Sequence, residues 1–261
     1  MMRIVVCMKA VPATNEVRLD PVTHTIIRDG RQAVVNPFDA AALETAVRIK
    51  KTEHAWVTAL SMGIPATESL LRDALARGAN QGILLSDRAF AGADTLATSY
   101  TLAAGIRKNG FYRLIICGRM AVDGDTAQIG PELAGVLGIP CLTDVCEITA
   151  VSEEEITVIR QTDQGRRKER TELPALITVM KDICLPRMPS ISGIRYGEGG
   201  PVHIWDAAML GIDTARTGLN GSATQVVRTF TPPREQETVY LKGTEEEQAR
   251  ALCALCREVM S

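Results

Sequence analysis

Leu114-Ile115-Ile116-Cys117-Gly118 is an apolar run of strand length, and the polar segment Asp123-Gly124-Asp125-Thr126-Ala127-Gln128-Ile129-Gly130-Pro131 follows it before a helical stretch that begins at Glu132. This order predicts a strand, a polar turn and a helix. In an open α/β sheet, ligands bind at the carboxyl ends of strands, where helix N-termini present free N–H groups to anions. Gly118 and Gly124 lack a Cβ and can admit a phosphate close to the backbone, while Thr126 and Gln128 can add hydrogen bonds. The alternative is an ordinary loop whose Asp and Thr side chains only cap a helix.

The alternation of strand and helix recurs through the first half of the chain. Apolar strands are predicted at Arg3–Met8, Ala55–Leu60, Ile83–Leu85 and Leu114–Cys117, with helical patterns after each of them. Continuous apolar strands are typical of a sheet that is buried on both faces. The pattern therefore predicts an α/β fold with a doubly wound, mostly parallel sheet and right-handed crossovers.

The helix starts carry their own signals. Asn36 can cap the first helix, and Pro37 suits its first helical position. Asp94, Thr95, Thr98 and Ser99 place a carboxylate and hydroxyls at the start of another helix. Hydroxyls and free N–H groups at such a position suit a pyrophosphate. For Asp94 alone, helix capping is the favoured interpretation.

After about Gly138 the regular alternation of strands and helices ends. The apolar and basic runs Ile156–Ile159 and Arg166–Thr171 flank Asp163-Gln164-Gly165, which predicts an inserted β-hairpin. The segment Pro186–Gly193 is expected to be a loop whose exposed apolar members, Met188 and Ile191, pack locally or contact a partner. Gly197, Gly199 and Gly200 are also expected in a loop, so they form no dinucleotide-binding fingerprint.

The last part of the chain is predicted to be an arm. Thr231-Pro232-Pro233 indicates an extended linker, and Thr244-Glu245-Glu246-Glu247 is a capping-box pattern for a final helix that reaches about Val259. We expect residues 1–220 to form the α/β domain and residues 221–261 to form an extended C-terminal arm. Because the arm has little core of its own to bury, docking on a partner subunit is favoured over folding back onto its own domain.

Composition excludes several classes of function. The net charge is −2 and aromatic residues make up 4% of the chain, which argues against nucleic-acid binding. No apolar run approaches the length of a membrane span, and the N-terminus lacks a signal-peptide pattern. A cytoplasmic protein, or one in the matrix of an organelle, fits best. The seven cysteines lack framework spacing, which indicates reduced thiols, and Cys253 and Cys256 are expected to pack in a helix and not to bind metal.

The sequence favours a binding function without catalytic residues. There is no phosphate loop, no Ser-His-Asp or Cys-His pattern, and no set of metal ligands around Asp123 and Asp125. Three strand ends instead carry small or polar residues: Cys7 to Lys9, Ser61-Met62-Gly63, and Gly118 onward. In a doubly wound sheet these ends share one crevice.

At this point the chain resembles the β subunit of electron-transfer flavoproteins over essentially its whole length. The resemblance rests on Val5–Lys9, the helix start Asn36–Asp39, Ala79–Ile83, the Pro-Pro linker, Val239–Thr244 and, most strongly, Gly118–Pro131. It implies an α/β fold of the adenine-nucleotide-binding type and a heterodimer in which the α subunit carries a flavin and is embraced by the C-terminal arm. It also implies an electron-transfer subunit that is not an enzyme by itself.

The resemblance, combined with the strand ends and the hydroxyl-rich helix start, assigns cofactor-binding residues. They are Cys7, Lys9, Asn36, Pro37, Phe38, Asp39, Met62, Asp94, Thr95, Thr98, Ser99, Gly118, Ala121, Val122, Asp123, Gly124, Asp125, Thr126, Ala127, Gln128, Ile129, Gly130, Pro131 and Glu132.

The family divides by what the β subunit holds. The stretch Ser86–Ser99 resembles the electron-bifurcating branch, which implies FAD in the β site and NADH as the electron donor. Electrons then go to a low-potential acceptor such as ferredoxin or flavodoxin, and through the α-subunit flavin to an acyl-CoA or related dehydrogenase. The alternatives are a plain electron carrier with structural AMP and a non-redox adenine-nucleotide-binding protein. The dehydrogenase-docking loop of the family corresponds to Pro186–Arg195, where Ile191 lies nearest the family's Leu and lysines are fewer.

Overall fold

The computed structural model describes residues 1–13, 33–227 and 240–260. The chain divides into two compact units, Met1–Val226 and Val227–Ser261, and each is described here by itself. The first unit holds all the strands among the described residues, and the second holds the last helix. The predicted Pro-Pro linker lies outside the described residues.

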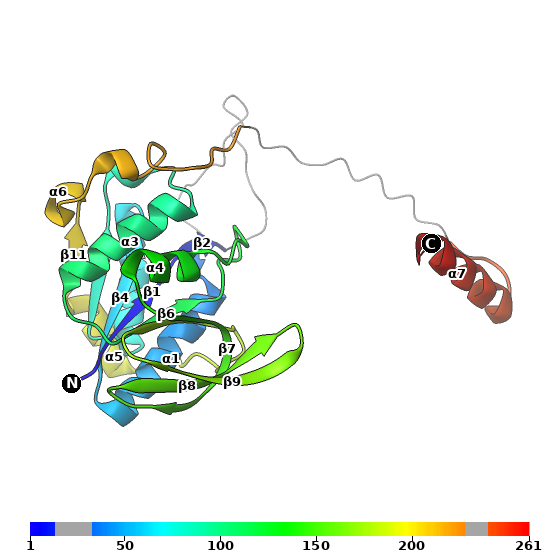
Figure 1. The fold of residues 1–261 in the computed structure, drawn as a ribbon, viewed down its shortest axis with the longest axis horizontal. Coiled ribbons are helices and arrows are strands. Elements are labelled where there is room, and N and C mark those ends of the chain that lie inside the picture. Colours follow the sequence, from blue (N-terminus) through cyan, green and yellow to red (C-terminus); the bar gives the residue numbers. More distant parts are fainter. Residues whose placement is uncertain (14–32, 228–239, 261) are drawn as a thin grey trace. The chain divides into compact units, whose positions relative to one another are not determined.

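A nine-stranded sheet forms the centre of the first unit (Figure 1). Its order is β11-β5-β4-β1-β6-β10-β7-β8-β9. The strands are β1 (Arg3–Cys7), β4 (Trp56–Met62), β5 (Gln81–Leu85), β6 (Leu114–Gly118), β7 (Cys141–Val151), β8 (Glu155–Thr162), β9 (Gly165–Glu172), β10 (Ala175–Val179) and β11 (Val202–Trp205). All neighbours pair in parallel except β7 with β8 and β8 with β9. The predicted mostly parallel sheet is confirmed. A separate antiparallel pair joins β2 (Ala10–Pro12) to β3 (Ala33–Val35).

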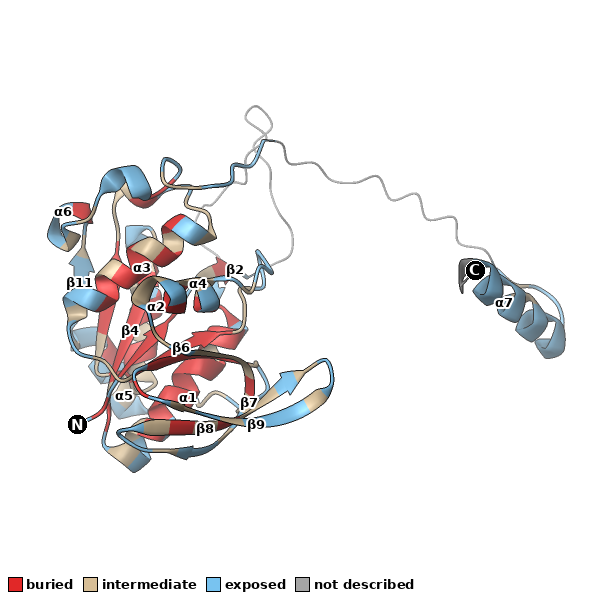
Figure 2. Cartoon of the chain, in the orientation of Figure 1, coloured by how far each residue is buried: buried red, intermediate tan, exposed pale blue. Residues whose placement is uncertain are grey.

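Helices cover both faces of the sheet, as expected for a doubly wound fold. The helices of the domain are α1 (Pro37–Glu53), α2 (Glu68–Ala76), α3 (Thr95–Asn109), α4 (Ile129–Leu137), α5 (Ile191–Gly199) and α6 (Ala207–Leu210), with short 3-10 turns η1 (Pro65–Thr67), η2 (Arg88–Phe90) and η3 (Thr214–Arg216). Successive strand residues point to opposite faces. Ile4 therefore packs in one buried cluster with Leu43 of α1, whereas Val5 packs in the other with Leu102 of α3 and Leu133 of α4. Figure 2 shows the central strands as the most buried part of the unit.

The predicted hairpin is present as β8 and β9. Asp163 and Gln164 connect the two strands. Gly165 has a φ of +116°, a backbone angle that residues with a Cβ rarely adopt. The basic residues of β9 are exposed and contact acidic neighbours, as in the ion pair of Arg170 with Glu155 of β8 at 3.5 Å.

Residues Ile191–Gly199 form a helix, so the expectation of a loop was wrong for the end of Pro186–Gly193 and for Gly197 and Gly199. Helix α5 begins at Ile191, and Ser190 caps it through Oγ, which accepts a hydrogen bond from Gly193 N at 3.0 Å. A side chain at Gly193 would collide with the carbonyl oxygen of Ala76 in α2. The glycines thus allow α5 to lie close against α2, and this packing holds a helix that local propensity disfavours.

The second unit contains α7 (Glu245–Met260). The predicted capping box is confirmed, because Thr244 N donates to Glu247 Oε2 at 2.8 Å and Glu247 N donates to Thr244 Oγ1 at 3.4 Å. The expected packing of Cys253 and Cys256 is not observed within this unit, where both thiols are free and exposed. In the part of the chain that the structure describes, no helix has both the length and the apolar character needed to cross a bilayer.

Candidate functional site

The carboxyl ends of three neighbouring strands form the base of the candidate site. The chain moves from β1 to β4 and β5 on one side, then returns to β6 on the other side of β1. Such a reversal of strand order is where open α/β sheets bind ligands. Cys7, Met62 and Gly118 stand at or near these strand ends, as the sequence predicted for the shared crevice.

Asp39, in the first turn of α1, joins two of these ends. Its Oδ2 accepts a hydrogen bond from Lys9 N at 2.8 Å, and its Oδ1 accepts one from Gly118 N at 3.2 Å. The carboxyl group is buried, and burial disfavours the charged form more than the hydrogen bonds favour it. The pKa of Asp39 is therefore raised to about 7. Asp39 therefore places a carboxyl group with a near-neutral pKa between the ends of β1 and β6.

Gly118 is required by protein packing. A side chain at this position would collide with Asp39 Oδ1 and with Phe38, so the absence of a Cβ lets the start of α1 meet the end of β6. The close approach at Gly118, which the sequence led us to expect of a phosphate, is made by Asp39 and Phe38. Gly124 differs, because a Cβ there would meet nothing within 4 Å.

Asn36 holds the loop that follows β6. It stands at the N-cap position of α1, as predicted, but its side chain makes no capping hydrogen bond. Instead its Nδ2 donates to Met120 O at 2.8 Å, and its Oδ1 accepts from Val122 N at 3.3 Å. The predicted side-chain cap is thus replaced by a contact that fixes the loop against α1.

Lys9 adds a second tie to the same loop. Its Nζ lies 2.7 Å from Asp123 Oδ1 and 2.8 Å from Oδ2. Residues 122–126 are exposed beyond this ion pair. Asp125 and Ala127 have positive φ values of 48° and 54°, which are unusual for residues with a Cβ. The loop therefore projects from the strand ends with its backbone held in a specific and strained form.

A second group of polar side chains joins α3 to α4. Thr95 Oγ1 donates to Glu132 Oε1 at 3.0 Å and lies 3.3 Å from Gln128 Oε1. Ser99 Oγ donates to Glu132 Oε2 at 3.3 Å. The structure therefore brings the hydroxyl-rich start of α3 against the start of α4, although 37 positions separate Thr95 from Glu132.

Asp94 belongs to a different set of contacts. Its carboxylate accepts hydrogen bonds from Ala97 N at 3.0 Å and from Thr224 N at 2.9 Å. Its own N–H donates to Ser222 Oγ at 2.8 Å. Burial alone would raise the pKa of Asp94, but these donated hydrogen bonds lower it. Asp94 therefore caps α3. Its partners Ser222 and Thr224 could not be found from the sequence, because nothing near them in the chain signals a contact with a residue so distant.

The remaining assigned residues frame these two groups. Phe38 and Gly130 are buried, and a side chain at Gly130 would collide with Thr178. Thr98 lies in the first turn of α3, where its N–H donates to Asp94 O at 3.0 Å. The others line the start of α1, the loop or the start of α4: Pro37, Ala121, Thr126, Ile129 and Pro131. No group of three or more His, Cys, Asp or Glu suited to a metal ion occurs among the described residues.

The sequence profile of the Electron transfer flavoprotein domain matches residues 23–210. The chain belongs to the electron transfer flavoprotein family. Within this family, the chain is 44% identical over 244 residues to the caffeyl-CoA reductase–Etf complex subunit CarD of Acetobacterium woodii, which covers 93% of each chain. It is 42% identical over 254 residues to the electron transfer flavoprotein subunit beta of Megasphaera elsdenii, covering 95% of this chain and 94% of the relative. Protein FixA of Sinorhizobium fredii is 41% identical over 253 residues, covering 94% and 89%.

These relatives confirm the resemblance found in the sequence. The chain is an electron-transfer subunit of the electron transfer flavoprotein β type, related also to Protein FixA. In this family context, the candidate nucleotide site is formed by the ends of β1, β4 and β6 and by the loop after β6, which Asn36 and Lys9 hold in place.

Proposed function

We propose that this chain binds FAD at the carboxyl ends of β1 and β6 and takes electrons from NADH for bifurcation. One electron path leads to a low-potential acceptor such as ferredoxin or flavodoxin, and the other leads through the flavin of an α subunit to an acyl-CoA or related dehydrogenase. The α subunit is the partner that the C-terminal unit binds. This proposal extends the family assignment to a specific cofactor, donor and set of partners.

The placement of α3 carries the proposal. The start of α3 lies against the start of α4 through the contacts of Thr95 and Ser99 with Glu132. A ligand longer than a mononucleotide would therefore reach from the strand ends to the N-terminus of α3. The first N–H groups of a helix have no intrahelical acceptor. The N–H group of Ala97 donates to Asp94. The N–H groups of Thr95 and Leu96 would then donate to a pyrophosphate.

The residues of the chain would bind and orient the group, and the redox chemistry would come from the bound FAD itself. Asn36 and Lys9 fix the loop over the strand ends, and Asp39 keeps the ends of β1 and β6 together. Thr95 would turn its hydroxyl group from Glu132 to the pyrophosphate, whereas the buried Ser99 would keep its hydrogen bond to Glu132.

Structural AMP is the second candidate, and Glu132 is the observation that favours it. Its carboxylate already accepts hydrogen bonds from the hydroxyl groups of Thr95 and Ser99. A negative charge at this position would repel a pyrophosphate. AMP would use only the strand ends and the loop, and the chain would then serve as a plain electron carrier subunit.

The test is the cofactor content of the purified αβ heterodimer, extracted and quantified per αβ pair. Two FAD and no AMP are expected; one FAD and one AMP would replace the proposal with the second candidate. Thr95→Ala combined with Thr98→Ala is then expected to remove the β-site FAD. Ser69→Ala is the matched control, because Ser69 Oγ is an exposed hydroxyl at the start of α2 that bonds only its own helix region, at Ala66 O. Asp94→Ala is unsuitable here, since it would also uncap α3.

A further inference from the structure

A segment near the end of the first unit, residues 217–224, is bonded to the backbone that precedes α3. Thr217 Oγ1 donates to Ala89 O at 2.9 Å, and Leu219 N donates to Ala91 O at 2.9 Å. Thr217 is buried, although 128 positions separate it from Ala89. We call residues 217–224 the strap, because they fix the backbone between η2 and α3.

Two glycines with positive φ values lie at this contact. Gly218 has a φ of +54°, and a side chain there would collide with the carbonyl oxygens of Ala89 and Ala91. Gly92 has a φ of +74°, and a Cβ there would lie 3.3 Å from the Cβ of Leu219. The strap therefore lies close against the segment before α3 because Gly218 lacks a side chain.

The end of the strap binds Asp94, the N-cap residue of α3. Ser222 Oγ accepts a hydrogen bond from Asp94 N at 2.8 Å and donates to Gly218 O at 2.8 Å. Thr224 N and Thr224 Oγ1 donate to Asp94 Oδ2 at 2.9 Å and 3.1 Å. The other carboxylate oxygen, Oδ1, accepts from Ala97 N at 3.0 Å. One oxygen of Asp94 therefore bonds the helix and the other bonds the strap.

The cap of α3 is complete without the strap. A capping side chain accepts the N–H of the second or third helical residue, and Asp94 accepts that of Ala97, the third. Ser222 and Thr224 bond the N–H of Asp94 and its second carboxylate oxygen, and neither group belongs to the hydrogen bonds of the helix. The strap contacts therefore need a reason other than capping.

That reason lies in the second helical residue, Leu96. With the donors of Thr224 removed, Asp94 Oδ2 would be available to the N–H of Leu96 as well. Burial alone would raise the pKa of Asp94, but the hydrogen bonds from Ala97 and Thr224 lower it, so the carboxylate is charged at neutral pH. A charged carboxylate across the start of α3 would compete with a phosphate for its N–H groups and repel it. The strap prevents this by engaging Oδ2.

We propose that Ser222 and Thr224 are positioning residues for a pyrophosphate: they hold the carboxylate of Asp94 on the strap and leave the N–H groups of Thr95 and Leu96 to the ligand. This inference rests on the proposed function, in which FAD supplies the pyrophosphate. AMP has a single phosphate and would use only the strand ends and the loop, so its binding does not depend on the strap. The strap therefore contributes to the choice between the two nucleotides.

The test is equilibrium binding of FAD, ADP and AMP to the αβ heterodimer that keeps its α-subunit flavin and is depleted of the β-site cofactor. ADP carries the pyrophosphate without the flavin, and AMP lacks it. The double variant Ser222→Ala with Thr224→Val removes both hydroxyl groups. It is expected to weaken FAD and ADP binding about tenfold, the value of one hydrogen bond to a charged group. AMP affinity stays unchanged.

Glycine variants move the strap without touching these hydroxyl groups. Gly218→Ala would push the strap off Ala89 O and should weaken FAD and ADP binding as the double variant does. Gly211→Ala is the matched control, because Gly211 has a φ of +64° and a Cβ there meets nothing within 4 Å. It introduces the same kind of backbone strain and leaves the strap in place. Thr224→Ser keeps both donors and should bind FAD as the unmodified protein does. Should Gly218→Ala not fold, the double variant carries the test.

Three results would overturn the inference. They are an unchanged FAD affinity in the double variant, an equal loss of AMP affinity, which indicates a general structural role, and a loss for FAD without a loss for ADP, which places the effect at the flavin. Failure of the proposed function is distinguishable from these. In that case the unmodified heterodimer itself binds AMP and no FAD, and the inference about the pyrophosphate falls with it.

Discussion

The backbone N–H of Gly118 donates a hydrogen bond to Oδ1 of Asp39 at 3.2 Å, so the end of β6 is tied to the first turn of α1. The other oxygen of the same carboxylate accepts from Lys9 N, directly after β1. A single buried side chain therefore closes the point where the strand order reverses. This contact lies at the base of the candidate nucleotide site, and the raised pKa of Asp39 leads to a prediction about stability and pH.

Stability should fall as the pH rises through the titration of Asp39. Its pKa is about 7 in the folded protein and 3.8 for an ordinary Asp, so between these values the folded state holds a proton that the unfolded state has released. This group therefore lowers the free energy of unfolding from about pH 4 to pH 7, by at most ~1.4 kcal/mol per pH unit. Urea unfolding from pH 5 to pH 8 measures it. Asp39→Asn removes the titration, and equal slopes in both proteins would refute the assignment.

Gly118→Ala should destabilise the protein by about 1–3 kcal/mol, because the added methyl group must displace Phe38 or Asp39 from a packed contact. Gly124→Ala is the control, since a Cβ there meets nothing within 4 Å. Thermal or urea unfolding of the two variants gives the comparison. Similar stabilities would show that the close packing at Gly118 relaxes without cost.

Glu132→Gln should strengthen FAD binding at the β site if the pyrophosphate lies at the start of α3. The change removes a negative charge next to Thr95 and Ser99, keeps one oxygen that can accept a hydrogen bond from one hydroxyl group, and supplies an NH2 group that can donate to the other. If removing this repulsion is worth ~1.4 kcal/mol, the affinity for FAD rises about tenfold. Equilibrium titration of the cofactor-depleted heterodimer with FAD measures it. AMP affinity serves as the internal control, and an equal gain for AMP would argue against a pyrophosphate at α3.

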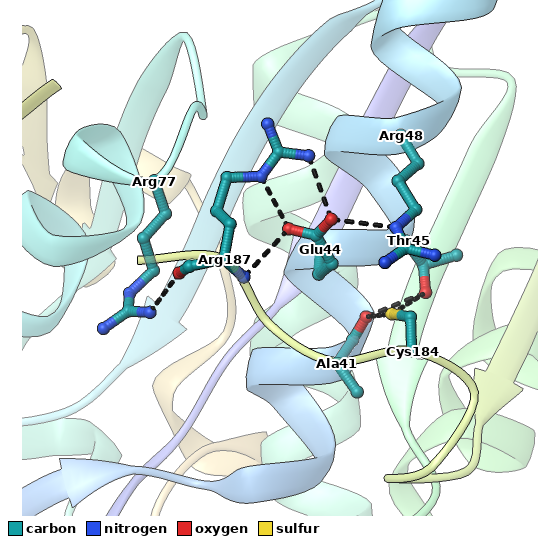
Figure 3. A network of polar contacts seen from close by, with 7 residues as sticks. All are labelled: Ala41, Glu44, Thr45, Arg48, Arg77, Cys184 and Arg187. Atoms are coloured by element: carbon teal, nitrogen blue, oxygen red, sulfur yellow. Dashed lines mark hydrogen bonds and ion pairs between the residues drawn. The ribbon is translucent and has the colours of Figure 1, made fainter. Parts of the chain in front are cut away.

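Glu44→Gln should destabilise the protein by about 1–3 kcal/mol at neutral pH, since it weakens the hydrogen bonds of a buried carboxylate to Arg187 and Arg48 (Figure 3). The folded pKa of about 2 lies below the ordinary value of 4.5. The stabilisation is therefore present above pH 4.5 and is lost as the pH falls toward 2. Unfolding at pH 7 and pH 3 should show a smaller difference between the two proteins at pH 3; a constant difference would contradict this account.

Truncation after Val226 should leave the first unit folded and abolish association with the α subunit. The cut follows the boundary of the compact unit and keeps Ser222 and Thr224, which bond to Asp94. Truncation after the predicted boundary at residue 220 would remove these partners and confound the result. Far-UV circular dichroism checks the fold, and co-purification with the α subunit checks association. Unchanged co-purification would reject the arm as the docking element.

Strands and helices with local signals were predictable from sequence. β6 is a continuous apolar run, and the capping box at Thr244 and Glu247 is a contact within one helical turn. The strand β7 was missed because most residues of Cys141–Val151 are only partly buried or exposed, so the strand lacks an apolar run. Helix α5 was missed because its glycines act through packing on α2, which propensity does not encode.

The sequence by itself determined the α/β class, the hairpin, the helix starts and the family, because each depends on periodicity or on motifs read along the chain. Only the tertiary structure decided the side-chain pairings of the site. Asp39 meets Gly118 across 79 positions, Asn36 meets Met120 across 84, and Glu44 meets Arg187 across 143. Such contacts follow from the order of the strands in the sheet and from which helices pack on which face. A polar residue therefore has the same local sequence signal whether it caps a helix, ties two strands or holds a ligand loop.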